Sequence, residues 1–237
     1  MNLRRGAGRP LVIGHRGAAA HEAENTLPAL AAGVAAGADL VEFDVGPDLR
    51  LAHSARERPA ADLSLDEALA FLSSHGVGVH LDAKQPGYEQ ELVDAIRRHG
   101  LEGRTVVSTA FGQTTRRLEE LAPGLPRAIG YPRDRFGVAR IHWPRTLTRA
   151  GAAVTAQAMP LRLPFLLRRA RANVLSLHHT LCSRSAVATS HRLGAPVLAW
   201  TVNDEASVRR LAGIGVDGIV SDDPEMARRV LATLDRP

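Results

Sequence analysis

Short apolar runs, each about the length of a β-strand, alternate with helical patterns along the whole chain. The runs that we interpret as strands are 11–13, 40–45, 79–84, 105–108, 126–130, 173–177, 196–201 and 218–221. Eight strands that alternate with helices predict an α/β fold, the TIM (β/α)8 barrel. We expect residues 1–237 to form this barrel as a single domain.

The starts of two helices carry capping signals. Asn25 is predicted to cap a helix through 29–32 that has Pro28 in its first turn. Ser64 and Glu67 have the spacing of a capping box at the start of the next helix. These signals indicate that the loops after the first two predicted strands end at Asn25 and Ser64.

One region, 136–171, does not follow the alternating pattern. It contains Pro160 and Pro164, and prolines interrupt a long amphipathic helix, so we predict a barrel helix with an irregular connection. An alternative is that the basic and apolar stretch 161–169 forms a flap that makes transient contact with an anionic membrane surface.

Polar side chains gather at the C-terminal ends of the first two predicted strands. His15 and Arg16 follow the first strand, and Glu42 and Asp44 share one face of the second because they are two residues apart. Two carboxylates on one face of an apolar strand repel each other unless a cation compensates them. A hard divalent metal is the simplest such cation.

Further polar and aromatic residues are predicted at the same end of the barrel. Asp82 and Lys84 share a face of the third strand with His80, and Trp200 closes the seventh strand. A short hairpin arm after the second strand would bring His53 back toward the strand ends.

Each of these features alone has an ordinary structural explanation. A single histidine is often a turn residue, a carboxylate pair can lie on a solvated edge, and Trp200 can be a packed indole. Their combination at the C-terminal ends of the strands predicts an active site, because catalytic residues of TIM barrels lie there. His178 and His179 at the end of the sixth strand could reach this site, although such a pair is more often structural.

Composition and charge exclude several other classes of protein. The net charge of +5 comes almost entirely from arginine, and no basic run is interleaved with aromatic residues as in a nucleic-acid groove. Cys182 is the only cysteine, so an intramolecular disulfide is excluded. No apolar run has the length of a membrane span, and the default expectation is a cytoplasmic protein of undetermined oligomeric state.

The polar motifs together resemble the signature of the glycerophosphodiester phosphodiesterase family. The resemblance rests on His15-Arg16-Gly17, Glu24-Asn25-Thr26, Glu42-Phe43-Asp44, His53, Trp200-Thr201-Val202-Asn203 and Gly215-Val216-Asp217-Gly218-Ile219-Val220-Ser221-Asp222. It implies a TIM barrel, a divalent metal and hydrolysis of glycerol-linked phosphodiesters to sn-glycerol 3-phosphate and an alcohol.

The resemblance also implies roles for individual residues. His15 and His53 would be the acid and base, and Glu42, Asp44 and Asp82 would hold one metal ion, either Ca²⁺ or Mg²⁺. It further implies an intramolecular route in which a glycerol hydroxyl attacks phosphorus and a cyclic phosphate is then hydrolysed.

Three other residues are assigned to the substrate. A planar guanidinium suits bidentate contact with a phosphate, and a lysine supplies a point charge, so Arg16 and Lys84 are predicted to bind the substrate phosphate. The resemblance places Trp200 in the substrate pocket, against the glycerol or the head group.

The chain departs from the family pattern near the second histidine. Ser54 follows His53 where the family usually has an acidic residue, and Asp82 stands where a glutamate is usual. The segment between His53 and Ser64 is very short, so the small insertion that usually covers the active site is expected to be missing.

Two alternatives therefore remain beside hydrolysis of a small phosphodiester substrate. One is phospholipase-D-like cleavage of lysolipid or sphingolipid head groups, which an aspartate at position 82 also fits. The other is a barrel that binds phosphodiesters or anionic lipid without turnover, which the shortened segment after His53 would favour.

Overall fold

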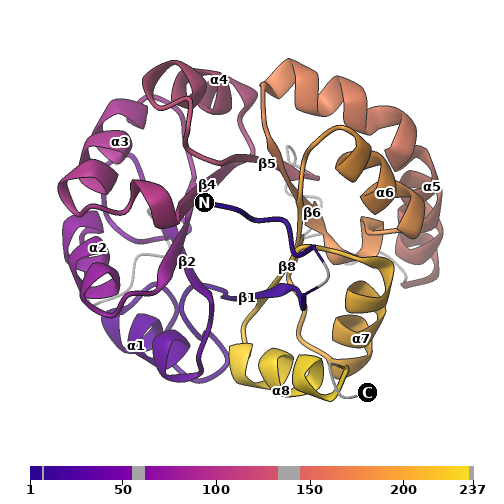
Figure 1. Cartoon of the computed structure of the whole chain (residues 1–237), viewed down its shortest axis with the longest axis horizontal. Coiled ribbons are helices and arrows are strands. Elements are labelled where there is room, and N and C mark those ends of the chain that lie inside the picture. The colour runs from indigo at the N-terminus through magenta and orange to yellow at the C-terminus, as the bar shows by residue number, and fades with distance from the viewer. Residues whose placement is uncertain (7, 55–61, 133–144, 235–237) are drawn as a thin grey trace.

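The chain folds into a closed barrel of parallel strands with helices around it (Figure 1). The computed structural model describes residues 1–6, 8–54, 62–132 and 145–234. The strands are β1 (Leu11–Gly14), β2 (Leu40–Val45), β3 (Gly78–Ala83), β4 (Thr105–Thr109), β5 (Arg127–Tyr131), β6 (Val174–His178), β7 (Val197–Trp200) and β8 (Gly218–Ser221). They pair in chain order, and β8 pairs with β1 to close the barrel. The predicted TIM barrel is confirmed.

The helices form the outer ring and follow the strands in alternation (Figure 1). They are α1 (Leu27–Ala35), α2 (Leu65–Ser74), α3 (Glu89–Arg98), α4 (Gly112–Leu121), α5 (Arg145–Ala170), α6 (Arg184–Arg192), α7 (Glu205–Ile214) and α8 (Pro224–Leu234). Two short 3-10 helices, Glu102–Arg104 and His179–Leu181, complete the regular structure of the described residues. In that part of the chain, no helix combines the length and the hydropathy that crossing a bilayer requires.

Alternation along the strands separates the apolar core from the polar site. On β2, Val41, Phe43 and Val45 are fully buried in a cluster with the surrounding helices, whereas Glu42 and Asp44 point to the other face. The register of β2 on β3 places Glu42 beside His80 and Asp44 beside Asp82. Strand pairing therefore brings together side chains that are about 40 residues apart in sequence.

A separate apolar cluster fills the interior of the barrel. It consists of Leu3, Ile13, Leu40, Val106, Ala128, Val174, Leu198 and Val220, all nearly inaccessible to solvent. Leu3 belongs to the N-terminal segment, which crosses the middle of the ring (Figure 1). The barrel is thus a packed core, and a site can open only at the ends of its strands.

The start of α1 differs from the prediction. Thr26, not Asn25, is the N-cap, and its hydroxyl accepts a hydrogen bond from the Ala29 N–H. Asn25 instead has a φ of 60° and uses its side chain to contact Asp44. The capping box predicted from Ser64 and Glu67 is confirmed at the start of α2.

The barrel helix predicted within 136–171 is confirmed, but the interruption expected from its prolines is wrong. Arg145–Ala170 is one 26-residue helix that contains Pro160 and Pro164. Met159, Leu163 and Leu167, at four-residue spacing, are buried in the core, so packing offsets the backbone hydrogen bonds that the prolines remove. Residues 136–144 lie outside the described residues.

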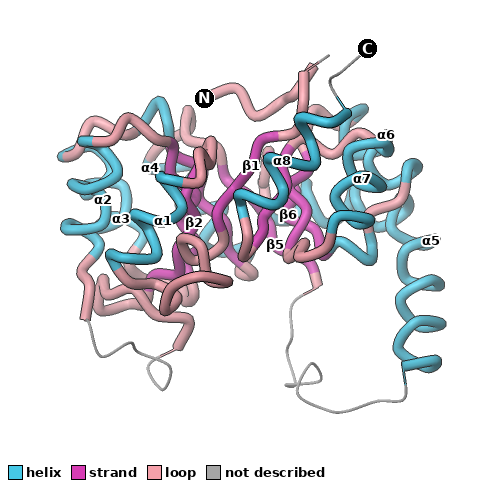
Figure 2. The backbone as a smooth tube through the Cα atoms, turned by 90° about the horizontal axis from the view of Figure 1, so that it is seen from below, coloured by secondary structure: helices cyan, strands magenta, loops and turns pink. Residues whose placement is uncertain are grey.

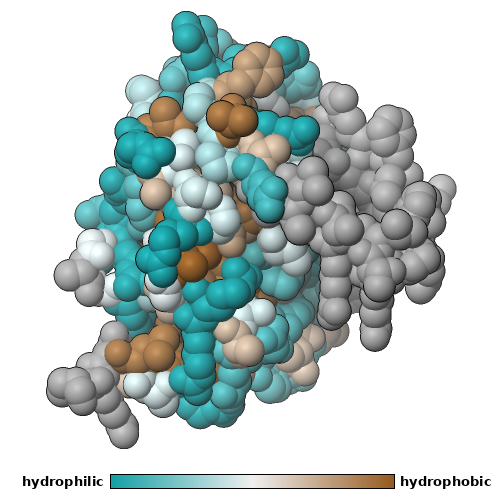
Figure 3. All heavy atoms as spheres, turned by 90° about the vertical axis from the view of Figure 1, so that its right-hand side faces the viewer, coloured by the Kyte–Doolittle hydropathy of each residue, from teal (hydrophilic) through white to brown (hydrophobic). Residues whose placement is uncertain are grey.

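The face that α5, α6 and α7 form carries mainly hydrophilic side chains with separate apolar groups among them (Figure 3). Figure 2 shows that the lower part of α5 extends beyond the barrel. The hairpin arm predicted at 49–53 is reduced to two isolated antiparallel bridges, Val45↔Leu51 and Arg50↔Ser64.

Candidate active site

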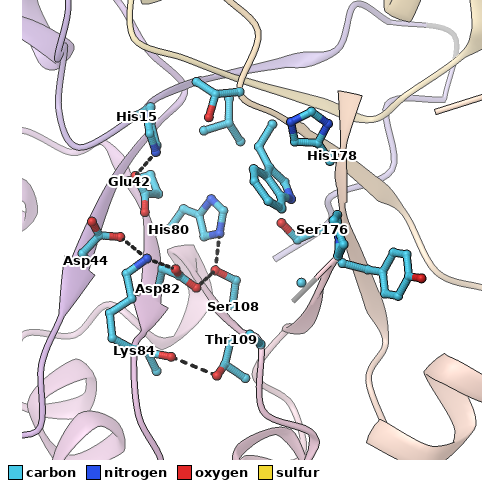
Figure 4. Close-up of a pocket in the computed structure, with 18 of the residues that line it drawn as sticks. His15, Glu42, Asp44, His80, Asp82, Lys84, Ser108, Thr109, Ser176 and His178 are labelled. Carbon is cyan, nitrogen blue, oxygen red and sulfur yellow. Dashed lines mark hydrogen bonds and ion pairs between the residues drawn. The ribbon is translucent and has the colours of Figure 1, made fainter. Parts of the chain in front are cut away.

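A cavity of about 1060 Å³ lies at the C-terminal ends of the strands (Figure 4). All eight residues that the sequence assigned to the site line this cavity: His15, Arg16, Glu42, Asp44, His53, Asp82, Lys84 and Trp200. They come from β1, β2, β3 and β7 and the loops that follow them, so the barrel assembles the predicted set.

Three carboxylates form the centre of this site. Glu42, Asp44 and Asp82 each offer an oxygen, and these oxygens lie within 4.8 Å of one another. Glu42 and Asp44 are almost completely buried. Burial and the charge of Asp44 raise the pKa of Glu42 to about 7, because a second negative charge is unfavourable there.

Lys84 provides a counter-charge for two of the carboxylates. Its Nζ lies 2.5 Å from Asp44 Oδ1 and 2.5 Å from Asp82 Oδ2. Burial alone would lower the pKa of Lys84, but the neighbouring carboxylates raise it above its usual range, so the amine is protonated. Burial likewise acts to raise the pKa of Asp44, but the charges of Lys84 and Arg16 and a hydrogen bond from His53 hold it far below its usual range.

Arg16 is held in a strained backbone conformation beside the same carboxylates. Its φ is 49°, and Gly17 follows at 95°. A Cβ at Gly17 would lie 2.3 Å from the carbonyl carbon of Ala29, so only glycine fits against the start of α1. The Arg16 guanidinium contacts Asp44 Oδ2 at 3.0 Å and Glu24 Oε2 at 2.5 Å.

His15 is oriented by a carboxylate that sequence reasoning did not assign to the site. Its Nδ1 lies 2.5 Å from Asp222 Oδ1, and its Nε2 lies 3.9 Å from Glu42 Oε2. Burial acts to lower the pKa of His15, but the hydrogen bond to Asp222 and the charge of Glu42 outweigh burial and raise it. Asn203 holds Asp222 in turn, because its Nδ2 donates to that carboxylate and its Oδ1 accepts the Asp222 backbone N–H at 3.0 Å.

His53 lies next to Asp44, whereas His15 lies next to Glu42. The Nδ1 of His53 is 3.4 Å from Asp44 Oδ2 and 3.1 Å from the Nη2 of Arg16. Its side chain is 42% exposed, compared with 20% for His15. His15 and His53 therefore lie beside different carboxylates of the acidic cluster, and His53 is the more exposed of the two.

A buried hydrogen-bonded chain supports the third carboxylate. Ser108 Oγ donates to Asp82 Oδ1 at 2.7 Å, so it accepts a hydrogen bond from His80 Nε2 at 2.9 Å (Figure 4). Burial lowers the pKa of His80 to about 4, and the imidazole is neutral. The sequence placed His80 near the metal ligands but gave no signal for Ser108, which lies on β4.

Trp200 and His178 line another part of the cavity. Their rings meet edge to face with centroids 5.1 Å apart. His178 lines the cavity, whereas its neighbour His179 does not. Burial lowers the pKa of His178 to about 4, so this histidine adds no positive charge near neutral pH.

Comparisons with known proteins agree with this geometry. The model of the glycerophosphoryl diester phosphodiesterase family matches residues 15–46 and 141–226, which include His15, Glu42 and Asp44. A Bacillus subtilis protein with the provisional name of glycerophosphodiester phosphodiesterase is 24% identical over 252 residues, covering 90% of this chain and 95% of its own length.

Solved structures show the same fold. A glycerophosphodiester phosphodiesterase from Parabacteroides distasonis superposes with a TM-score of 0.75 at 17% identity, covering 96% of this chain and 99% of that one. A phosphodiesterase from Oleispira antarctica, solved in complex with the product sn-glycerol 3-phosphate, has a TM-score of 0.71 at 20% identity, covering 94% and 97%. From its motifs, its barrel and these relatives, the chain belongs to the glycerophosphoryl diester phosphodiesterase family.

Proposed function

We propose that this chain is a metal-dependent phosphodiesterase that hydrolyses glycerophosphodiesters to sn-glycerol 3-phosphate and an alcohol. The observation that carries this proposal is the cluster of three carboxylates within 4.8 Å, approached by two histidines, in a cavity of a barrel of this family. The sn-glycerol 3-phosphate complex of the Oleispira relative supports the same class of substrate.

The residues present fit one divalent metal ion. Glu42, Asp44 and Asp82 supply hard oxygen donors, and burial together with the charge of Asp44 raises the pKa of Glu42, which a bound cation would relieve. These three side chains would hold Ca²⁺ or Mg²⁺. When bound, the ion would neutralise part of the charge on the substrate phosphate.

Arg16 and Lys84 would contact the substrate phosphate from beside this cluster. Both are already paired with carboxylates, which fixes their positions before substrate arrives. An incoming phosphate would give each cation a second anionic partner. Charge-assisted bonds of this kind orient a phosphodiester as well as bind it.

The two histidines would divide the proton transfers. Because the pKa of His15 is raised, we assign it as the acid that protonates the leaving alcohol. His53, more exposed and beside Asp44, is assigned as the base that removes a proton from the attacking oxygen. That oxygen would be a glycerol hydroxyl in the intramolecular route, which forms a cyclic glycerol phosphate before hydrolysis.

The proposal is tested by measuring sn-glycerol 3-phosphate release from glycerophosphocholine, glycerophosphoethanolamine and glycerophosphoglycerol with Ca²⁺, Mg²⁺ or EDTA. We expect activity with at least one metal, none with EDTA, and loss in His15→Ala. His75→Ala, an exposed histidine outside the cavity, is the matched control. Absence of product with both metals refutes the proposal, whereas a cyclic phosphate lipid formed from lysophosphatidylcholine would support phospholipase-D-like cleavage.

Transient contact with an anionic membrane surface is also proposed, on the outer face of α5. Leu161 is 86% exposed and Phe165 is 68% exposed, one helical turn apart, and Arg169 lies over the Phe165 ring. Replacing both apolar residues by serine should reduce binding to vesicles that contain phosphatidylglycerol. Equal binding by both proteins would exclude this contact.

A further inference from the structure

The cavity extends beyond the acidic cluster, and the carboxylates among its described lining residues are confined to one side of it. The three carboxylates that line it, Glu42, Asp44 and Asp82, lie on β2 and β3. Among the described lining residues of β5, β6, β7 and α5 there is no carboxylate, and Arg162 of α5 supplies a positive charge.

Arg162 is placed by one hydrogen bond that leaves most of its donors unused. Its Nη1 donates to Tyr131 Oη at 3.0 Å. Within the described part of the chain, no ion pair joins Arg162 to a carboxylate, whereas Arg16 and Lys84 are each paired with two. A guanidinium carries five N–H donors in a planar fork, so Arg162 can still bind an anion bidentately.

None of the other described residues on this side compensates that charge. His178 is neutral near pH 7, and Trp200 packs against it. An indole alone would favour a quaternary ammonium group through its π-face. Arg162 opposes this preference, because a cationic head group would meet a like charge in the same cavity.

We propose that the side of the cavity lined by Tyr131, Arg162 and Trp200 receives the alcohol part of the substrate, and that Arg162 selects alcohols bearing a second phosphate group. This inference rests on the proposed phosphodiesterase function and specifies its substrate class. The acidic cluster and histidines act on the diester phosphate, while Arg162 binds the second phosphate beside Tyr131.

The test compares kcat/KM for two substrates that differ only in the second phosphate, glycerophosphoinositol 4-phosphate and glycerophosphoinositol, with glycerophosphocholine as the cationic case. In the unaltered enzyme we expect a preference of about tenfold for the phosphorylated substrate, which rising ionic strength reduces. Arg162→Gln should remove that preference, leave glycerophosphoinositol within about twofold, and raise the value for glycerophosphocholine.

Arg169→Gln is the matched control, since it removes the same charge from the same helix outside the cavity and should change none of the ratios. Equal kcat/KM for the two inositol substrates, or a preference that persists in Arg162→Gln, overturns the inference while the proposed function stands. Absence of turnover on all three substrates with Ca²⁺ and Mg²⁺ refutes the proposed function and the inference with it.

Discussion

Replacing Asp222 by asparagine should impair the acid role that we assign to His15 without changing the shape of the site. Asp222 is isosteric with asparagine, and its Oδ1 lies 2.5 Å from His15 Nδ1. The carboxylate also accepts a hydrogen bond from Asn203 Nδ2, so both of its oxygens act as acceptors. An amide has only one oxygen. In one of these two contacts, the new NH₂ group would therefore face another N–H donor.

The magnitude follows from the bond that is lost. A charge-assisted hydrogen bond contributes about 1.5–3 kcal/mol and a neutral one about 1 kcal/mol. If the amide keeps its oxygen toward His15, the pKa of His15 should fall, and a loss of about 1.4 kcal/mol in this bond should lower the rate by about tenfold. If the amide turns its NH₂ toward His15, the imidazole is held in the wrong tautomer, and the fall in kcat should exceed a hundredfold, about 2.7 kcal/mol.

The assay is the pH dependence of kcat for release of sn-glycerol 3-phosphate, with the titration of His15 followed by NMR. We expect the limb of the profile that belongs to His15 to move to lower pH, with a smaller change in KM. Asp223→Asn is the control, because Asp223 caps α8 through the Met226 N–H and asparagine caps equally well. An unchanged kcat and an unchanged pH profile in Asp222→Asn would refute the reasoning.

Three further predictions follow from other parts of the structure. Asp82→Asn should weaken binding of Ca²⁺ or Mg²⁺ by about tenfold or more in a calorimetric titration, since one of three charged donors is lost, and unchanged affinity would exclude Asp82 as a ligand. The pKa of His80 is about 4 in the folded chain and about 6.5 when unfolded, so the unfolded state binds more protons between these values and stability is lost as the pH falls. His80 should therefore contribute a loss of about 2 kcal/mol of unfolding free energy between pH 7 and pH 5. The raised pKa of Glu42 acts in the opposite direction, so this loss is measured as the difference in pH dependence between the metal-free protein and His80→Asn. The same pH dependence of urea unfolding in both proteins would contradict this. Gly17→Ala should destabilise the protein by about 3 kcal/mol or more because its Cβ would overlap the backbone of Ala29, whereas Gly124→Ala, with open space around it, should have little effect on the midpoint of unfolding.

The barrel was predictable from sequence because its signals are local. Each strand is a short apolar run, and the spacing of two residues between Glu42 and Asp44 was enough to place both carboxylates on one face. Catalytic residues of TIM barrels lie at the C-terminal ends of the strands, and this rule selected eight residues that all line one cavity in the structure.

The parts that sequence reasoning missed depend on contacts between distant segments. Asn25 does not cap α1 because its side chain accepts the Asp44 N–H and donates to the Asp44 carboxylate. The helix through Pro160 persists because Met159 and Leu163 are buried in the core. Asp222 became a partner of His15 only through the pairing of the last strand with the first, although its position after a predicted strand was a usable signal.

The pairing of β8 with β1 also has a consequence for how the protein is made. The register aligns Gly14 with Ser221, and the residues that follow each of them form the contact between His15 and Asp222. His15 precedes Asp222 by about 200 residues, so a nascent chain already contains Glu42, Asp44 and Asp82 long before His15 acquires its partner. The orientation of His15 is therefore completed only when β8 pairs with β1 and closes the barrel.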